Sequence, residues 1–327
     1  MGQRVHPGEL LDPDRVRVAA AEEALSERLA TRDPLSSLLR SLTLDEASEP
    51  DTFLGDPGAE RGRLFGGLVA AMSVSALART VEPARRLHSL HAYFLRFGRH
   101  GTPIRLAVTR VRDGGSFSTR RVEAEQEGGT IFVATASFCL PEEGVSHQDP
   151  APEAPAPDGL PDRDELRERL VGRRSRNHAV EVRLCDPHPF GSSEPRPARQ
   201  RLWIRPRGPL PDDPLVHEAV LAYVSDTAFL STLNLRHPMR WDERSAASLD
   251  HALWIHQPPR ADDWLLFVCE SPVAHAARGL LHGAIYDAAG RRLASVAQEA
   301  LMRRRAVGEE GGRARASASP KGPTPGS

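Results

Sequence analysis

Lysine is almost absent from this 327-residue chain, although lysine and arginine together number 43. Lys321, close to the C-terminus, is the only lysine. A P-loop, the phosphate-binding lysine of protein kinases and the Schiff base of pyridoxal enzymes each need a lysine inside the folded region. These three enzyme classes are therefore excluded. Any phosphate-binding site in the body of the chain must use arginine.

Cysteine is also scarce. Cys139, Cys185 and Cys269 are widely spaced, and no C-x-x-C motif is present, so neither a disulfide framework nor a zinc knuckle is indicated. The N-terminus lacks the apolar core of a signal peptide. The longest uncharged stretch, residues 64–78, is too short to span a bilayer. We therefore expect a soluble cytoplasmic protein without a membrane span.

Neither charge nor histidine spacing points to a nucleic acid or a metal ion. The formal net charge is −1, so no overall basic field favours nucleic acid or an anionic surface. His88 and His91 are three positions apart, and His251 and His256 are five apart. On a strand, these odd spacings place the two side chains on opposite faces. The sequence predicts no metal site and no cofactor.

Proline-rich and polar segments divide the chain. Residues 1–34 are charged and form an extension that we expect to be disordered apart from a possible helix at 16–29, and residues 306–327 form a disordered tail. Residues 142–178 hold a cluster of prolines and are predicted to be a linker. Two folded domains are left, at 35–141 and at 179–305.

The two domains show the same order of elements. Each begins with an apolar helix that is followed by four strands bounded by turn residues. The expected helices are 65–80 and 214–233, and the expected strands are 87–97, 104–113, 116–126 and 130–140, then 246–255, 264–271, 276–286 and 291–303. Two dipeptide matches, His91-Ala92 with His251-Ala252 and Ala134-Thr135 with Ala294-Ser295, fall 160 positions apart. We interpret the chain as a duplicated unit.

The first apolar helix indicates the architecture of that unit. Residues 64–78 are apolar on nearly every side, as a helix enclosed by a curled antiparallel sheet must be. That arrangement is an α+β hot-dog fold, and two tandem units make a double hot-dog. A tandem pair of β-sandwiches is the alternative that the pattern leaves open.

A carboxylate stands out in the second apolar helix. Residues 219–235 hold no charge except that of Asp226. Burying an unpaired carboxylate costs several kcal/mol of folding free energy. Asp226 must therefore be hydrogen-bonded or must face a cavity. The competing interpretation is that Ser225 and Asp226 cap a second helical segment.

Two further polar residues lie on the strands that follow. Regular alternation in the segment SLDHALWIH places Ser248 and Asp250 on one face and His251 on the other, so we interpret Asp250 and His251 as a structural pair. Gln298 shares the inward face of its strand with small apolar residues and needs a hydrogen-bond partner. The sequence contains neither a G-x-S-x-G elbow nor a cysteine with a histidine close by in a suggestive setting.

Two consecutive glycines, Gly66 and Gly67, stand at the start of the first apolar helix. On one interpretation, their backbone N–H groups face a carbonyl oxygen or an anion. On the other, the glycines allow the backbone to pack closely against the sheet.

Several blocks together resemble a known family. The chain is similar to the type II acyl-CoA thioesterases from about residue 38 to residue 303. The blocks that carry this likeness are RGRLFGGLVAAMSVSALA, LHSLHAYFLRFG, VTRVRDGGSFSTRRVEAEQEGGTIFVATASF, VLAYVSDTAFL, SLDHALWIHQP, WLLFVCESPVAHAARGL and LASVAQEALMR. The resemblance implies a double hot-dog fold and hydrolysis of fatty acyl-CoA to free acid and CoA.

The resemblance also implies a catalytic site. Asp226, Ser248 and Gln298 match the family's catalytic positions, and they are expected to hold a water that attacks the thioester without a covalent acyl-enzyme. In the first domain, His88 and Phe138 lie 160 positions before Ser248 and Gln298. We therefore expect one site in each chain.

Other activities and partners remain open at this stage. One alternative is hydration of an enoyl-CoA, although its G-D-x-N-P-x-H-like motif is missing, and another is a non-catalytic acyl-CoA-binding protein. Arg120, Arg121 and Arg278 are candidates for holding the CoA phosphates. Edge strands of the sheets favour a homo-oligomer.

Overall fold

The computed structural model describes residues 33–59, 62–172, 179–186, 190, 194–240 and 243–305. The predicted helix 16–29 and the predicted tail 306–327 lie outside the described residues. Within the described ranges, no helix is long and apolar enough to cross a membrane.

The N-terminal half is an antiparallel sheet packed on an apolar helix. Its strands are β1 (Asp45–Glu46), β2 (Thr52–Gly55), β3 (Arg86–Phe94), β4 (Ile104–Asp113), β5 (Phe117–Gln126) and β6 (Gly129–Cys139). Helix α3 (Gly66–Ala78) contacts β2 to β6 and is buried from Gly67 to Leu77. A helix without charge on any side is stable only when it is enclosed, as the sequence predicted.

The C-terminal half repeats this arrangement with more elements. Its strands are β7 (Val180–Leu184), β8 (Arg199–Pro206), β9 (Arg244–Ser248), β10 (Asp250–Ile255), β11 (Leu265–His275), β12 (Arg278–Tyr286) and β13 (Arg292–Arg304). Helix α5 (Pro214–Ser225) packs against α3, whereas α6 (Phe229–Arg236) lies over β8, β9 and β11 to β13. Two short helices, α2 (Pro34–Leu42) and α4 (Arg163–Val171), complete the described elements.

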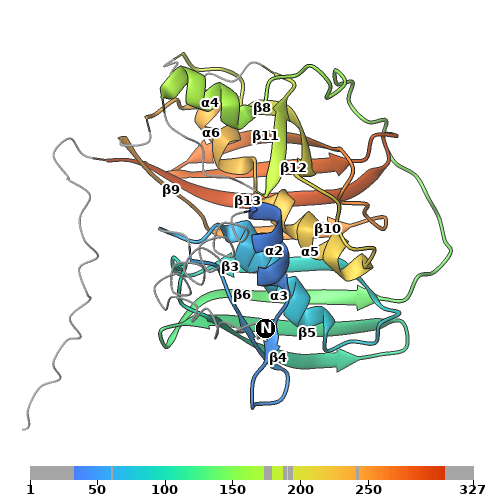
Figure 1. The fold of residues 1–327 in the computed structure, drawn as a ribbon. Coiled ribbons are helices and arrows are strands. Elements are labelled where there is room, and N and C mark those ends of the chain that lie inside the picture. The colour runs from blue at the N-terminus through green and yellow to red at the C-terminus, as the bar shows by residue number, and fades with distance from the viewer. Residues whose placement is uncertain are drawn as a thin grey trace, which may run out of the picture.

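One continuous sheet joins the halves. The strand order is β1-β2-β4-β5-β6-β3-β10-β13-β12-β11-β8-β7, and β9 also pairs with β13. The junction is the antiparallel pair β3–β10, in which Leu90 faces Leu253 and Ala92 faces His251. Figure 1 shows α2, α3 and α5 between the teal and green strands of the first half and the orange strands of the second. This is the expected double hot-dog, with helices enclosed by a curled sheet.

The repeat is less regular than the sequence indicates. His91 is exposed whereas His251 is 1% exposed, so the two matched histidines lie on opposite faces of the sheet. The inward residues are Leu90 and Ala92 on β3, and His251 and Leu253 on β10. The matched His-Ala dipeptides are therefore not structurally equivalent, whereas Ala134 and Ala294 of the other match are both buried.

Two predicted elements are interrupted in the C-terminal half. The predicted helix 214–233 is broken after Ser225, where Asp226 is the C-cap of α5, and Ala228 is the N-cap of α6. The competing interpretation, in which Ser225 and Asp226 cap the second helical segment, is therefore wrong. The predicted strand 246–255 is broken at Leu249, which separates β9 from β10. Both breaks lie at the candidate site.

Candidate active site

Asp226 lies where α5 ends, in the interior between the two halves. The helix starts from Asp213, which accepts a hydrogen bond from the Leu215 N–H (2.9 Å), with Pro214 at its first position. Asp226 is only 9% exposed, and its Oδ2 accepts a hydrogen bond from the backbone N–H of Gly67 (2.9 Å). The carboxylate of one half is thus held by the first helix of the other.

Ser248 and Gln298 reach Asp226 from two neighbouring strands. The hydroxyl of Ser248, the last residue of β9, donates to Asp226 Oδ1 at 3.4 Å. Gln298 on β13 is fully buried, and its Nε2 donates to Ser248 Oγ at 2.8 Å. The structure therefore brings together all three residues that the sequence singled out. The contacts are those of a connected polar network inside an apolar core.

His251 is a fourth member of this network, and the sequence analysis missed it. Its Nδ1 lies 2.7 Å from Gln298 Oε1, and its Nε2 lies 2.8 Å from Ser225 Oγ. Regular alternation predicted that Ser248 and His251 would lie on opposite faces, and this prediction is wrong. No local signal in the sequence places His251 here, because its position depends on which strands Leu249 contacts.

The break at Leu249 explains why Ser248 and His251 both contact Gln298. In a regular antiparallel strand, the N–H and C=O of one residue point to the same neighbour. The Leu249 N–H instead donates to Glu299 on β13, and its C=O accepts from the Phe94 N–H of the first half (both 2.9 Å). Asp250 Oδ1 accepts the Glu299 N–H at 2.6 Å, which replaces the missing backbone contact. The alternation shifts by one residue, so His251 turns inward. Asp250 contacts the Glu299 backbone and His251 contacts Gln298 and Ser225, so the expected pairing of Asp250 with His251 is wrong.

The two glycines at the start of α3 allow the close approach of the halves. A Cβ on Gly67 would lie 2.5 Å from the Tyr223 carbonyl oxygen, and a Cβ on Gly66 would lie 2.8 Å from Asp226 Oδ2. Any side chain at either position would push α3 away from α5 or away from the carboxylate. The pair therefore gives an N–H to Asp226, as one interpretation expected, whereas Gly67 packs closely against the backbone of helix α5 and not against the sheet.

The electrostatics of the site follow from burial. Burial raises the pKa of the Asp226 carboxyl, and His251, Gln298, Gly67 and Ser248 oppose that rise. Burial also lowers the pKa of the His251 ring, which favours its neutral form. A carboxylate with a raised pKa beside a neutral polar network is suited to accept a proton.

The arginines that were candidates for CoA phosphates are engaged elsewhere. Arg120 is 1% exposed, and its guanidinium donates to Thr80, Arg112, Thr119 and Asp113. All of its N–H groups have protein acceptors, so Arg120 is structural. Arg121 pairs with Glu123, and Arg278 pairs with Glu299, both on the surface. Exposed pairs of this kind exchange partners easily, so these two arginines remain candidates.

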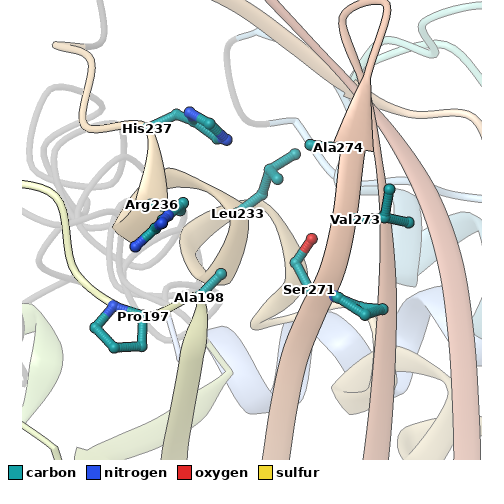
Figure 2. A pocket seen from close by; sticks show the side chains of 9 residues that line it. Pro197, Ala198, Leu233, Arg236, His237, Ser271, Val273 and Ala274 are labelled. Atoms are coloured by element: carbon teal, nitrogen blue, oxygen red, sulfur yellow. The ribbon is translucent and has the colours of Figure 1, made fainter.

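Two cavities lie at the C-terminal end of α6. Cavities of about 360 and 300 Å³ share Leu233 and His237, and the larger is also lined by Arg236 and Ser271 (Figure 2). Their lining residues do not include Asp226, Ser248 or Gln298. Neither cavity is therefore the site of the polar network.

The positions that match the site in the first half carry different chemistry. His88 Nε2 lies 2.8 Å from Ser137 Oγ, and Phe138 is fully buried in the apolar core. Across the residues that the structure describes, no group of three or more His, Cys, Asp and Glu side chains could hold a metal ion. The three described cysteines are unpaired.

Comparison with known proteins identifies the family. The model of the acyl-CoA thioesterase N-terminal domain matches residues 56–139, and that of the acyl-CoA thioesterase C-terminal domain matches residues 148–302. Acyl-coenzyme A thioesterase 8 of Rattus norvegicus is 35% identical over 84% of this chain and 93% of its own length. Acyl-CoA thioesterase 2 of Haemophilus influenzae is 33% identical over 83% of this chain and 98% of its own.

Solved structures agree with this assignment. The acyl-CoA thioesterase II TesB2 of Mycobacterium marinum superposes with a TM-score of 0.70, at 39% identity over 84% of this chain and 99% of its own. A protein of unknown function with a hot dog fold from Alicyclobacillus acidocaldarius superposes with a TM-score of 0.68 at 21% identity over 82% of this chain and 98% of its own. It supports the fold alone. The chain belongs to the type II acyl-CoA thioesterase family.

Proposed function

We propose that this protein hydrolyses acyl-CoA thioesters to a free acid and CoA, with Asp226, Ser248 and Gln298 as the catalytic residues. The observation that carries this proposal is the contact of a buried carboxylate with a hydroxyl and an amide from two separate strands. Each group offers a hydrogen-bonding function that a water molecule needs, so together they can orient one water and remove its proton.

The reaction proceeds by direct attack of that water. The water oxygen forms a bond to the thioester carbonyl carbon while its proton moves to Asp226. The tetrahedral intermediate then collapses, the carbon–sulfur bond breaks, and the CoA thiolate leaves with the proton that Asp226 returns. General-base assistance of this type contributes roughly 10²–10⁴-fold to the rate. The raised pKa of Asp226 makes it a stronger base than an ordinary carboxylate.

A thiol-release assay tests the function. Acyl-CoAs of several chain lengths are incubated with the protein, and free CoA is measured. We expect release by the wild type and a loss of roughly 10²–10⁴-fold in kcat for Asp226→Asn. Asp263→Asn is the control, because Asp263 is exposed and outside the network. Wild-type rates in Asp226→Asn would refute the assignment of the base, and tight binding without thiol release would indicate a non-catalytic acyl-CoA-binding protein.

Hydration of an enoyl-CoA is the alternative enzyme activity, and it needs a histidine that faces the substrate beside the aspartate. His251 is near Asp226, but both ring nitrogens contact protein groups, Gln298 and Ser225, and the residue is 1% exposed. This geometry favours hydrolysis. An absence of hydrated product from an enoyl-CoA, measured by mass spectrometry, is the expected result.

We also propose that residues 35–141 and 179–305 form the two hot-dog domains and that 142–178 connects them. One active site in each chain follows, because His88 and Phe138 stand where the second half has Ser248 and Gln298. The outer strands β1 and β7 support a homo-oligomer, since such edges tend to be paired. Light scattering after size-exclusion chromatography measures its size. Three unpaired cysteines support a cytoplasmic location.

A further inference from the structure

The polar network extends past Gln298 to two residues that the proposed reaction does not use. His251 lies with Nδ1 at 2.7 Å from Gln298 Oε1 and with Nε2 at 2.8 Å from Ser225 Oγ. Ser225 is fully buried, and the Phe229 ring packs beside the imidazole at 6.2 Å between ring centres. The imidazole is enclosed on these sides, so it can act on the substrate only through Gln298.

The direction of each hydrogen bond follows from Asp226 outward. An ionised carboxylate only accepts, so the Ser248 hydroxyl uses its single proton toward Asp226. The Ser248 oxygen must then accept a proton from its other neighbour, which is the Nε2 amide of Gln298. The amide oxygen of Gln298 is left facing His251.

The same matching of donors and acceptors determines which nitrogen of the His251 ring carries the proton. An amide oxygen carries no proton, so His251 must present Nδ1–H to Gln298. The Ser225 hydroxyl lies 2.9 Å from the Ala222 carbonyl oxygen and 2.8 Å from His251 Nε2. The neutral ring leaves Nε2 bare, so in this state the single Ser225 proton is directed to Nε2 and not to the Ala222 oxygen. The other tautomer would reverse the chain: Nδ1 would accept from Gln298 Nε2, and Oε1 would face Ser248 and draw its proton away from Asp226.

We infer that His251 is a positioning residue, which fixes the Gln298 amide and so keeps the Ser248 hydroxyl directed at Asp226. This inference rests on the proposed function, because it assigns His251 a role only through Gln298 and Ser248. In this role His251 orients the groups that hold the water and exchanges no proton with the substrate. Hydrogen-bond partners that orient the ligands of metal sites contribute roughly 10–100-fold, and we expect an effect of that size here.

Nitrogen-15 NMR of the wild-type protein tests the orientation directly. The protein is labelled at histidine, and its ring nitrogens are recorded at neutral pH, with the His251 signals assigned by their absence from His251→Asn or any other His251 variant that folds. We expect His251 to be neutral, with a protonated Nδ1 and a bare Nε2. A protonated Nε2 with a bare Nδ1 would overturn the inference, because the amide would then point the other way.

Two matched substitutions test the effect on catalysis. An asparagine at 251 can place its amide nitrogen near the position of Nδ1, within reach of Gln298, whereas a glutamine places it near Nε2, toward Ser225. We expect His251→Gln to lower kcat roughly 10–100-fold relative to His251→Asn, with KM little changed. Equal rates, or a faster glutamine variant, would overturn the inference. His91→Gln is the control, because His91 is an exposed histidine on the neighbouring strand β3.

Gln298→Ala separates a failure of this inference from a failure of the proposed function. A wild-type kcat in Gln298→Ala would show that the catalytic residues are wrongly assigned. If Gln298→Ala loses activity while the two His251 variants are equal, only the positioning role is wrong. Thermal unfolding of each variant, compared with the wild type, shows whether a lower rate comes from a lower fraction of folded protein.

Discussion

The Asp226 carboxylate accepts a hydrogen bond of 2.9 Å from the backbone N–H of Gly67, which lies 159 positions earlier in the chain. The two residues belong to different halves, one at the start of α3 and the other at the end of α5. The candidate base is therefore held jointly by both halves. This contact gives the first half a direct part in the site, although its own matching positions carry no such network.

Gly67→Ala is predicted to damage both stability and activity. The added Cβ would lie 2.5 Å from the Tyr223 carbonyl oxygen, which is backbone and cannot move away alone. Overpacking of this kind costs about 1–3 kcal/mol of unfolding free energy. Denaturant unfolding and the thiol-release assay measure the two effects. Gly115→Ala is the control, because a Cβ there meets nothing within 4 Å, and identical behaviour of the two variants would contradict the prediction.

Asp226→Asn is predicted to stabilise the fold at neutral pH. Because burial raises the pKa of Asp226, the folded protein binds this proton more tightly than the unfolded chain does. That stabilisation is fully present below the unfolded pKa of about 3.9 and is lost as the pH rises through the folded pKa. We expect Asp226→Asn to unfold at a higher temperature than the wild type at neutral pH, with the gap closing in acid. Calorimetry at several pH values measures the unfolding temperature of both proteins. Equal unfolding temperatures at neutral pH would contradict the prediction that the buried Asp226 charge destabilises the fold.

Arg86 and Glu218 form an ion pair between β3 and α5 in which the carboxylate is buried, and breaking this pair is predicted to weaken the fold. The Arg86 guanidinium lies 2.6 Å from Glu218, whose side chain is 5% exposed. Arg86→Met leaves that carboxylate buried without its ion-pair partner, while the Leu87 backbone still donates a hydrogen bond to it. Breaking a buried pair in this way costs about 3–5 kcal/mol.

The double variant Arg86→Met, Glu218→Met tests whether the unpaired charge of Glu218 causes the loss of stability. It removes both charges, so we expect urea unfolding to show much of the lost stability restored. A double variant as unstable as Arg86→Met would mean that packing, and not the unpaired charge, carries the effect. Arg121→Met is the surface control, with an expected change below about 1 kcal/mol because its pair with Glu123 is exposed.

The described cysteines are predicted to react slowly with alkylating reagents at neutral pH. Burial raises the pKa of Cys185 to about 11, and burial also raises the pKa values of Cys139 and Cys269. Few thiolates are therefore present. We expect iodoacetamide to leave the rate of thioester hydrolysis unchanged, with modification followed by intact mass. Rapid inactivation that tracks modification of one cysteine would point to a thiol in the reaction.

Most of the strands and the buried helix α3 could be predicted from the sequence, because their patterns are long and regular. β4 begins and ends at the predicted residues, and α3 is buried from Gly67 to Leu77. The short elements α2, β1, β2, β7 and β8 were not predicted, since two to nine residues carry little periodic signal. The proline-rich segment also holds α4, whose N-cap Asp162 accepts two backbone N–H groups.

The site itself was predictable only in part. Asp226 and Gln298 were detectable because a polar residue inside an apolar element needs a partner. His251 was not detectable, because its place depends on the change of partner strand at Leu249, which no local pattern encodes. The contact of Gly67 with Asp226 likewise depends on how the two halves pack.

Rapid-quench mass spectrometry of the intact protein during the first turnover tests the central claim most directly. If a water held by Asp226, Ser248 and Gln298 attacks the thioester, free acid is released and the protein keeps its unmodified mass at every time point. A transient species heavier by one acyl group and located on Ser248 would contradict this account, because it would make the serine a nucleophile.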